Sequence, residues 1–492
     1  MTARVVSCLL LVACWGGIGA GPAVARWSAA KVIEQGRFPI VTFGPSGNAA
    51  IGAGQSSRDG SQIVATFLAS RRPHRNFAAP QRFGPMPTDS APNNGLRAIA
   101  LPSDGATVAL FGPPFDAGAA QPINAFVEAP GASRFGAAQQ IVKLGNATPD
   151  AQQTNTTTVV DTTRGEVVEA GLDDSSKLST ATLARGSRRF VVARRAPASL
   201  GSSDGPATLA TDDAGGTFLA GDGVRGCTTV AYRPPRGRFR TTYQTSDCSV
   251  NTKNPNVVGG LAATGDGYAT LLTENIGDVG TGPSTLLVQV GRFGRFGAPT
   301  LLSPDLLGLP PQFDIAIDRD GSATVFWRGC MPGKRDCGVY GEQGSVYSGF
   351  AGQPALIAAG APNVRLSGLV ADGAVAVQRC AAHRRCTIAV ALVRADRQFS
   401  QPQAITAHGH RLLELKSDDH GDLLLVWSND RGVLYAATKA SGARTVSTPH
   451  RLSGSGVNPG TVTAAFGPHR EAIVAWSRSG HTIASAYSTK AR

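Results

Sequence analysis

The chain has 492 residues, of which 60 are glycine and 31 are proline, and its formal net charge is +13. Only 16 % of the residues are charged, and this composition favours short strands joined by turns over long amphipathic helices. We therefore expect an all-β protein. The positive charge either suits an acidic partner or is spread over many loops without a specific role.

Residues 1–25 have the pattern of a secretory signal peptide. A basic start ending at Arg4 is followed by an apolar stretch, Val5 to Ala13, and by the small-residue site Ala23-Val24-Ala25. The alternative is a lipoprotein signal, because Leu11-Val12-Ala13-Cys14 is similar to the segment that ends in a lipidated cysteine. We expect a secreted protein that begins at Arg26, with lipid anchoring through Cys14 as the alternative. No later segment reaches the ~18 apolar residues that span a bilayer.

From residue 26 onward the sequence repeats a unit of about 52 residues. Each unit has an aromatic or branched landmark, then a strand, a polar turn and a second strand. Units of this length without helical periodicity are typical of four-stranded β-propeller blades. We predict one closed propeller of eight or nine blades over 26–492, with two smaller propellers as the alternative. The landmarks are Trp27, Phe77, Phe135, Phe190, Phe239, Phe296, Phe350, Phe399 and Val446.

The segment TDDAGGTF, which begins at Thr211, contains Asp213 and Gly215 in a predicted turn. It resembles the Asp box of the secreted bacterial sialidase and BNR propellers. In that superfamily the box is structural, and its aspartate bonds the backbone of the turn. The resemblance therefore implies a propeller fold and does not identify a reaction.

The same resemblance offers an enzymatic alternative. Sialidases carry Arg-Ile-Pro near the N-terminus, followed by an arginine and a catalytic aspartate, and here Arg37-Phe38-Pro39 is followed by Arg58 and Asp59. In the family the first arginine grips the substrate carboxylate and the aspartate is a general acid. The tyrosine nucleophile and the further arginines have no recognisable motif here. We therefore expect a non-enzymatic protein, and a sialidase-like hydrolase or lyase is the alternative.

The densest basic segment is YRPPRGRFR, in which four arginines alternate with Tyr232 and Phe239. In an exported protein such a patch would recognise an acidic polysaccharide or a partner protein, and we expect no nucleic-acid partner. We hypothesise a monomeric binding or scaffold propeller that uses the loops of one face. The four arginines are Arg233, Arg236, Arg238 and Arg240.

Six cysteines remain after the signal and fall into three local pairs. An even number of cysteines in an exported chain predicts disulfides. The spacings lack the close pairs that zinc sites use, and we expect neither a metal nor a cofactor. The predicted pairs are Cys227 with Cys248, Cys330 with Cys337, and Cys380 with Cys386.

The segment DIAIDRDGSATVFW raises the question of a metal-binding turn. Asp318 and Asp320 could ligate calcium, but the twelfth loop position is Gly329, where a bidentate glutamate would be needed. Sister turns read PSG, TGDG and GPHR, so we expect that the repeat does not keep the acids. We interpret the segment as a hairpin turn with Gly321 at positive φ.

A second aromatic marks the strand after each of the clearest turns. It lies six residues beyond the turn glycine at Phe111, Trp327 and Trp427, and Trp476 holds the same place after Arg470. These residues should be buried between blades. The strand after Trp27 should pair with the last blade, because an open ring would leave exposed strand edges.

Overall fold

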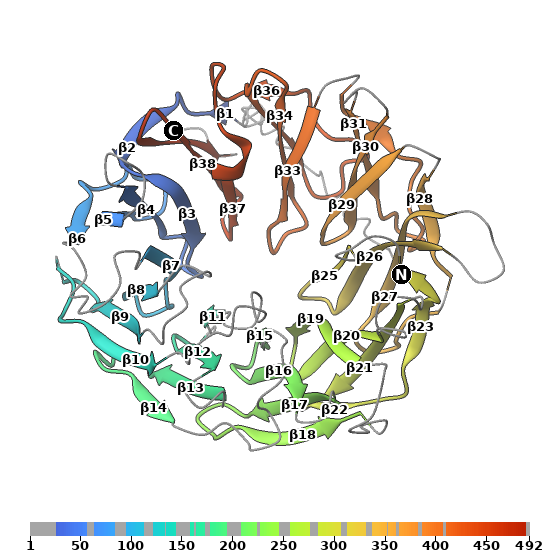
Figure 1. Cartoon of the computed structure of the whole chain (residues 1–492), viewed down its shortest axis with the longest axis horizontal. Helices are drawn as coiled ribbons and strands as arrows, with labels where there is room; N and C mark the ends of the chain where they lie inside the picture. Colours follow the sequence, from blue (N-terminus) through green and yellow to red (C-terminus); the bar gives the residue numbers. More distant parts are fainter. Residues whose placement is uncertain are drawn as a thin grey trace, which may run out of the picture.

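The computed structural model describes residues 26–488, except for short segments at 57–62, 84–94, 113–121, 133, 144–157, 162–163, 173–177, 194–207, 224–226, 246–255, 276–283, 307–311, 331–336, 352, 361–363, 382–385 and 407–409. Within these residues the chain forms nine antiparallel sheets around a central axis, a single nine-bladed β-propeller (Figure 1). The predicted all-β class is confirmed, and the alternative of two smaller rings is wrong. No helix in the described part of the chain has the length and apolar character of a membrane span.

The first four blades each have four strands in the order A, B, C and D from the axis outward. Blade 1 contains β3 (Arg37–Phe43), β4 (Ala49–Ser56), β5 (Ile63–Arg71) and β6 (Gln81–Phe83). Blade 2 contains β7 (Gly95–Ala100), β8 (Thr107–Gly112), β9 (Pro122–Glu128) and β10 (Gln139–Lys143). Blade 3 contains β11 (Thr158–Asp161), β12 (Val167–Leu172), β13 (Leu178–Leu183) and β14 (Val191–Ala193). Blade 4 contains β15 (Thr208–Thr211), β16 (Thr217–Gly223), β17 (Cys227–Arg233) and β18 (Arg240–Gln244).

The next blades keep this order, although two of them have a split edge strand. Blade 5 contains β19 (Asn256–Thr264), β20 (Tyr268–Asn275), β21 (Thr285–Arg292), β22 (Arg295–Phe296) and β23 (Thr300–Ser303). Blade 6 contains β24 (Asp305–Leu306), β25 (Phe313–Ile317), β26 (Ser322–Cys330), β27 (Cys337–Ser345) and β28 (Ala355–Ala359). Blade 7 contains β29 (Arg365–Ala371), β30 (Ala374–Cys380), β31 (Cys386–Leu392) and β32 (Gln403–Ala404). Blade 8 contains β33 (His410–Ser417), β34 (Leu423–Asn429), β35 (Leu434–Lys439) and β36 (His450–Arg451).

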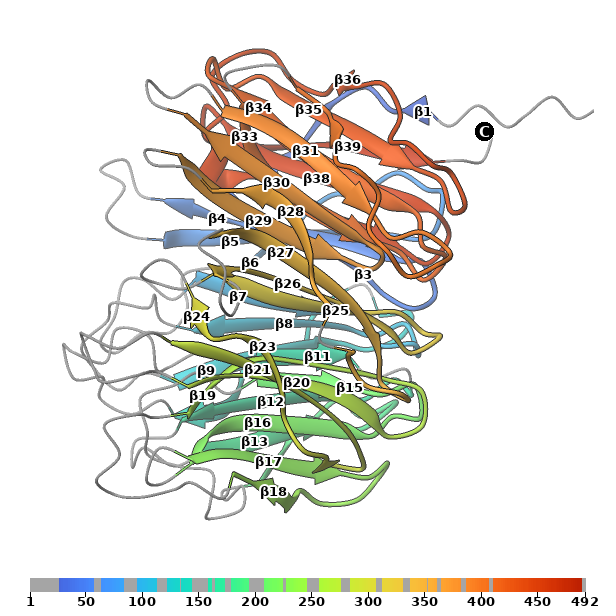
Figure 2. The same ribbon diagram turned by 90° about the vertical axis from the view of Figure 1, so that its right-hand side faces the viewer.

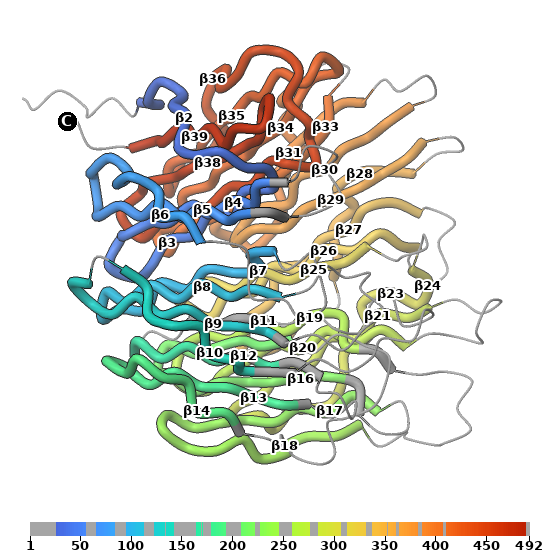
Figure 3. Tube along the Cα trace, turned by 60° about the vertical axis from the view of Figure 1, so that its left-hand side comes forward, coloured from blue at the N-terminus to red at the C-terminus, as the bar shows by residue number. Residues whose placement is uncertain are grey.

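Blade 9 joins the two ends of the described chain. It takes β37 (Thr463–Gly467), β38 (Glu471–Arg478) and β39 (His481–Ser488) from the C-terminal part, after a short 3-10 helix, Pro459–Thr461. Its outer strands are β1 (Arg26–Trp27) and β2 (Lys31–Gln35), which both pair antiparallel with β39. Figure 3 shows β2 beside β39. The prediction that the first strand closes the ring is confirmed. Each landmark residue lies in or just before the outermost strand of a blade, so the sequence unit is offset from the blade by one strand.

Apolar side chains are packed between neighbouring blades. Leu424 and Val426 of blade 8, for example, share a cluster with Val474 and Trp476 of blade 9. Because successive strand residues point to opposite faces, each B strand contacts both neighbours, and β8 is buried at all six positions. The predicted blade aromatics Phe111, Trp327, Trp427 and Trp476 are at most 1 % exposed.

Two of the predicted disulfides, Cys330–Cys337 and Cys380–Cys386, are present. Each joins facing residues where a B strand meets a C strand. Such short rings stabilise a hairpin mainly by restricting the unfolded chain. The third predicted pair includes Cys248, which lies outside the described residues.

The A–B and C–D turns all lie on one face of the propeller, because consecutive strands are antiparallel (Figure 2). Gly321 shows why glycine is used there: its φ is +83°, and an added Cβ would lie 2.2 Å from the Tyr347 ring. Either feature alone would disfavour a larger residue. We call the A–B end of the central channel the mouth and the ring of C–D turns the rim.

Candidate functional site

The mouth is acidic, which the sequence interpretation missed. The expectation that sister turns do not keep the acids of Asp318 and Asp320 is wrong, because six of the nine A–B turns carry at least one aspartate. The isolated turns compared in the sequence did not show that acids at different turn positions meet at one place. These aspartates are Asp104, Asp212, Asp213, Asp266, Asp318, Asp320, Asp372, Asp418, Asp419 and Asp422.

The rim, by contrast, is basic. Seven of the eight described C–D turns, all except that of blade 6, carry at least one exposed arginine. In eight of the nine units an arginine also stands one or two positions before the landmark residue. The exposed rim arginines are Arg72, Arg75, Arg134, Arg185, Arg188, Arg189, Arg236, Arg238, Arg292, Arg295, Arg394, Arg397 and Arg444.

A pocket of about 290 Å³ opens at the mouth. Its lining comes from the inner ends of five consecutive blades, 4 to 8, and it includes Ser417, Thr264 and one arginine, Arg319. Arg319 forms an ion pair with Asp419 across blade 7. Five carboxyl groups line the pocket: Asp213, Asp318, Asp372, Asp418 and Asp419.

Turn hydrogen bonds hold these aspartates in place. The Oδ1 atom of Asp418 accepts the backbone N–H groups of His420 and Asp422, both at 2.9 Å. Asp212 makes the same contacts in blade 4, where it accepts from Ala214 at 2.9 Å and from Gly216 at 2.7 Å. Each such bond satisfies a backbone donor that the tight turn would otherwise leave unpaired.

The Asp-box segment forms the A–B turn of blade 4, but the cap of this turn is the residue before the expected aspartate. Asp212 caps the turn, whereas Asp213 Oδ2 accepts from Gly265 N at 2.6 Å and from Thr264 Oγ1 at 3.1 Å in blade 5. A similar contact joins blades 7 and 8, where Ser417 Oγ accepts the N–H of Asp372 at 3.1 Å. The mouth is therefore a ring of turns tied to one another.

The pKa of Asp372 at the mouth is raised towards neutral pH. The pKa of Asp372 is raised to about 7, mainly by burial and also by the negative charges of Asp318 and Asp320, while Lys439 opposes the rise. Asp318 and Asp372 are also joined by a side-chain hydrogen bond. Two carboxyl groups in direct contact cannot both ionise easily, because their negative charges repel each other.

The mouth does not have the geometry of a metal site in the part of the chain that the structure describes. No three histidine, cysteine or acidic side chains there are close enough to ligate one ion. The calcium interpretation of Asp318 and Asp320 therefore has no third histidine, cysteine or acidic ligand among these residues. Asp318 Oδ1 accepts the N–H of Arg319 and Asp320 Oδ1 accepts that of Ser322, so both aspartates support the turn.

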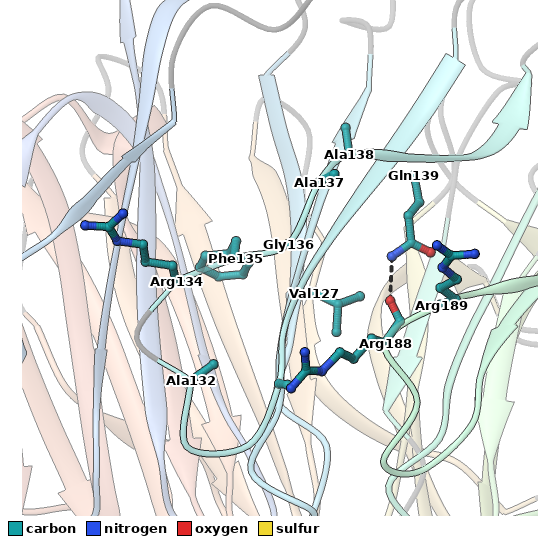
Figure 4. A pocket seen from close by; sticks show the side chains of 11 residues that line it. Val127, Ala132, Arg134, Phe135, Gly136, Ala137, Ala138, Gln139, Arg188 and Arg189 are labelled. Atoms are coloured by element: carbon teal, nitrogen blue, oxygen red, sulfur yellow. Dashed lines mark hydrogen bonds between the residues drawn. The ribbon is translucent and has the colours of Figure 1, made fainter.

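A groove of about 530 Å³ lies on the rim between the C–D turns of blades 2 and 3 (Figure 4). Phe135 is half-buried in its wall, and three exposed arginines, Arg134, Arg188 and Arg189, stand around it. None of the three makes an ion pair with any residue that the structure describes. The groove therefore has an apolar wall and three available cationic groups.

Two hydrogen bonds fix the shape of this groove. Gln139 of blade 2 donates through Nε2 to the carbonyl oxygen of Arg188 at 2.6 Å, and its Oε1 accepts from Phe190 N at 2.9 Å. The arginine-bearing turn of blade 3 is thus attached to blade 2. The arginines are spread around the opening: Arg134 points away from Arg188 and Arg189 (Figure 4). Such spacing suits several anionic groups along a chain better than one small anion.

A smaller groove of about 220 Å³ occupies the same position between blades 6 and 7. Phe350 and Phe399 line it, and Arg397 stands in the place that the blade 3 arginines have in the first groove. The repeat therefore builds this kind of groove more than once. The pattern of an arginine before an aromatic residue could have revealed it in the sequence.

The predicted basic segment requires one correction. Arg236, Arg238 and Arg240 are exposed, but Arg233 is only 5 % exposed and does not belong to the surface patch. Its guanidinium forms an ion pair with Glu166 of blade 3 and donates to the carbonyl oxygen of Gly237 at 3.3 Å. A buried cation needs such partners, so Arg233 joins two blades.

The residues of the enzymatic alternative do not form a site within the described chain. Arg37 is exposed at the start of β3, at the opposite end of that strand from the A–B turn. Arg58 and Asp59 lie outside the described residues.

Comparisons with known proteins show only distant similarity to solved structures. No protein-family model matches it, and no curated protein matches it. Among solved structures, the BP39L lectin from Burkholderia pseudomallei is 14 % identical, with a TM-score of 0.43 over 76 % of this chain and 100 % of the lectin. The PL25 ulvan lyase is 10 % identical, with a TM-score of 0.36 over 64 % of this chain and 80 % of the lyase. A eukaryotic initiation factor is 11 % identical, with a TM-score of 0.46 over 89 % and 94 % of the two chains. These values support no transfer of function.

Proposed function

We propose that this protein is an exported, non-enzymatic propeller that binds acidic polysaccharides through the arginine-lined grooves of its rim. The observation that carries the proposal is the groove between blades 2 and 3, where Arg134, Arg188 and Arg189 surround a fixed cleft without ion-pair partners among the described residues. The two disulfides support export, because such bonds persist in oxidising compartments.

Arginine and an aromatic wall together suit a uronic-acid chain. A guanidinium can hold a carboxylate through two parallel hydrogen bonds, and it stays charged at any physiological pH. The half-buried ring of Phe135 offers an apolar surface to the face of a sugar. Because similar grooves recur around the rim, one polymer could occupy two of them, and the second contact would add affinity by raising the effective concentration.

We favour a binding function over the hydrolase alternative, because Asp318 and Asp372 do not have the spacing of a glycosidase pair. Glycosidases need two carboxyl groups about 5 to 9.5 Å apart, so that a sugar or a water molecule fits between them. Asp318 and Asp372 instead bond to each other. This contact leaves no space between the two groups for a glycosidic bond.

The test is the affinity for polygalacturonate of the unaltered protein and of an Arg188→Ala/Arg189→Ala variant, measured by calorimetry at several salt concentrations. We expect the double variant to bind at least about tenfold more weakly, because each lost charge-assisted contact is significant. Binding should also weaken with added salt.

Arg431→Ala is the matched control, because Arg431 is exposed on the turn between β34 and β35, on the opposite face. It should leave the affinity unchanged, and neutral dextran should not bind. An unchanged affinity in the double variant, or equal binding of dextran, would show the proposal to be wrong.

A further inference from the structure

We propose that the mouth pocket is a binding site for an organic cation, an alkylammonium or guanidinium group about the size of a lysine or arginine side chain. This site is separate from the rim grooves, which have the opposite charge. The first ground is the charge of its lining. In a chain with 47 basic and 34 acidic residues, five carboxyl groups line one small pocket, and the single arginine among them is paired with Asp419.

The second ground is an acceptor that the protein leaves unused. Asp418 lines the pocket and is 7 % exposed, and its Oδ2 atom has no hydrogen-bond partner in the described structure. Its other oxygen already accepts both turn N–H groups. A buried carboxylate oxygen without a donor is unfavourable, and a bound cationic N–H group would supply the donor.

The third ground is the contact between Asp318 and Asp372, which come from the turns of adjacent blades. The Asp318 carboxyl group also accepts the backbone N–H of Arg319, and the backbone N–H of Asp372 donates to Ser417 Oγ. When Asp372 is protonated, its carboxyl group can hydrogen-bond to that of Asp318. A cation with several N–H donors could take the place of that proton and bridge both groups.

The size and spacing of the pocket favour an organic cation over a metal ion. A volume of about 290 Å³ corresponds to roughly ten water molecules, far more than one ion needs. In the described residues the carboxyl groups do not converge in threes on a common point. An ammonium or guanidinium group has several donors that can reach separate acceptors on different blades.

The test measures the binding of putrescine and of Nα-acetyl-lysine amide by calorimetry at about pH 8 and low salt. Asp372→Asn and Asp318→Asn keep the side-chain shape and should each weaken binding at least about tenfold, because each removes a charge-assisted contact. Asp430→Asn is the matched control, since Asp430 is exposed on the turn after β34, on the opposite face. It should change nothing.

A pH series adds a readout that a purely structural role would not affect. The groups facing Asp372 are Asp318, Asp320 and Lys439, and Asp213, Asp418 and Arg319 also line the pocket. Since the amine competes with a proton on Asp372, binding should weaken by about tenfold between pH 8 and pH 6, as Asp372 becomes protonated. Asp372→Asn should lose most of this dependence.

Several results would overturn the proposal: no binding of either amine, equal binding by Asp372→Asn in a variant that unfolds like the unaltered protein, or displacement of the amine by one calcium ion. Binding of putrescine alone would identify a free polyamine, and binding of the lysine amide as well would point to a basic side chain of a partner. Arg188→Ala/Arg189→Ala should still bind the amine. The site can therefore fail without affecting the rim proposal, and the reverse also holds.

Discussion

The mouth and the rim of this propeller are built by the same strands and lie on the same face, yet they carry opposite charges. Turns between A and B strands supply the aspartates of the mouth, and turns between C and D strands supply the arginines of the rim. Strand residues are occupied with packing blade against blade. The turns are therefore where this repeat is free to vary in charge.

Distance from the axis makes the two sets of charges behave differently. A–B turns of neighbouring blades touch, as Asp213 and Gly265 do, and Arg319 even reaches Asp419 two blades away. Coulomb repulsion rises as separation falls, and the charges of Asp318 and Asp320 accordingly help to raise the pKa of Asp372. Arginines on the wider rim are farther apart and can stay charged.

Opening the ring should have the largest effect, because both the mouth and the rim depend on closure of the propeller. A protein that begins at Gly36 lacks β1 and β2, and β39 then has an unpaired edge. Exposed edges pair with other chains, so we expect most of this protein to aggregate. Size-exclusion chromatography with light scattering would measure the aggregated fraction.

The control for this truncation is the protein that begins at Arg26. It should elute as a monomer and unfold cooperatively. If the shortened protein were also monomeric and had the same melting temperature, closure through β39 would not be what stabilises the ring.

The second largest effect should be on stability. It should distinguish the buried arginine Arg233 from the exposed arginines of the rim. Arg233→Ala leaves Glu166 without its buried partner, and removal of one member of a buried pair costs about 3 to 5 kcal/mol. Arg238→Ala, on the same turn but exposed, should change the free energy of unfolding by less than about 0.5 kcal/mol. Chemical denaturation measures both.

A double variant, Arg233→Met with Glu166→Gln, tests whether the unpaired buried charge causes the loss of stability. It should recover much of the lost stability, since no buried charge is left alone. Equal effects of Arg233→Ala and Arg238→Ala would mean that burial does not divide the rim arginines into two kinds.

The fold was readable from the sequence because its signals repeat. The nine landmark residues recur at one spacing, and this spacing is typical of a propeller blade. A second set of aromatics follows the same repeat: Phe111, Trp327, Trp427 and Trp476. The boundary of the blade was not readable in the same way. Trp27 looks like the start of a unit, and the pairing of β1 with β39 shows that Trp27 itself lies in an outer strand of the last blade, as the strand after it was predicted to do.

The charged surfaces were much harder to predict. Arg233 and Arg236 look equivalent in YRPPRGRFR, and only the turn geometry buries the first and exposes the second. Aspartates at unequal turn positions, such as Asp213 and Asp372, have no common motif, yet they line one pocket. A site assembled from many repeats has no local sequence pattern, because each repeat contributes only one to three residues.

The smallest predicted effect is on the pH dependence of stability, and it concerns the buried acid Glu34. Glu34 on the closing strand β2 is 4 % exposed, neither of its oxygens has a partner within the described residues, and burial raises its pKa to about 9. Its unfolded pKa is about 4.5, so the free energy of unfolding should fall as pH rises from about 4.5 to about 9. Glu34→Gln should remove this slope and add roughly 2 to 4 kcal/mol at about pH 8.

Salt then distinguishes Glu34 from Asp372. The pKa of Asp372 is raised by burial and also by the charges of Asp318 and Asp320, whereas the pKa of Glu34 is raised by burial alone. Added salt screens like charges at an open mouth but does not rehydrate a buried carboxyl group. Added salt should therefore lower the pKa of Asp372 and leave the pKa of Glu34 unchanged. NMR titration at two salt concentrations would measure both pKa values. Equal shifts would mean that the mouth acids do not interact, and the contrast between a crowded mouth and an open rim would lose its physical basis.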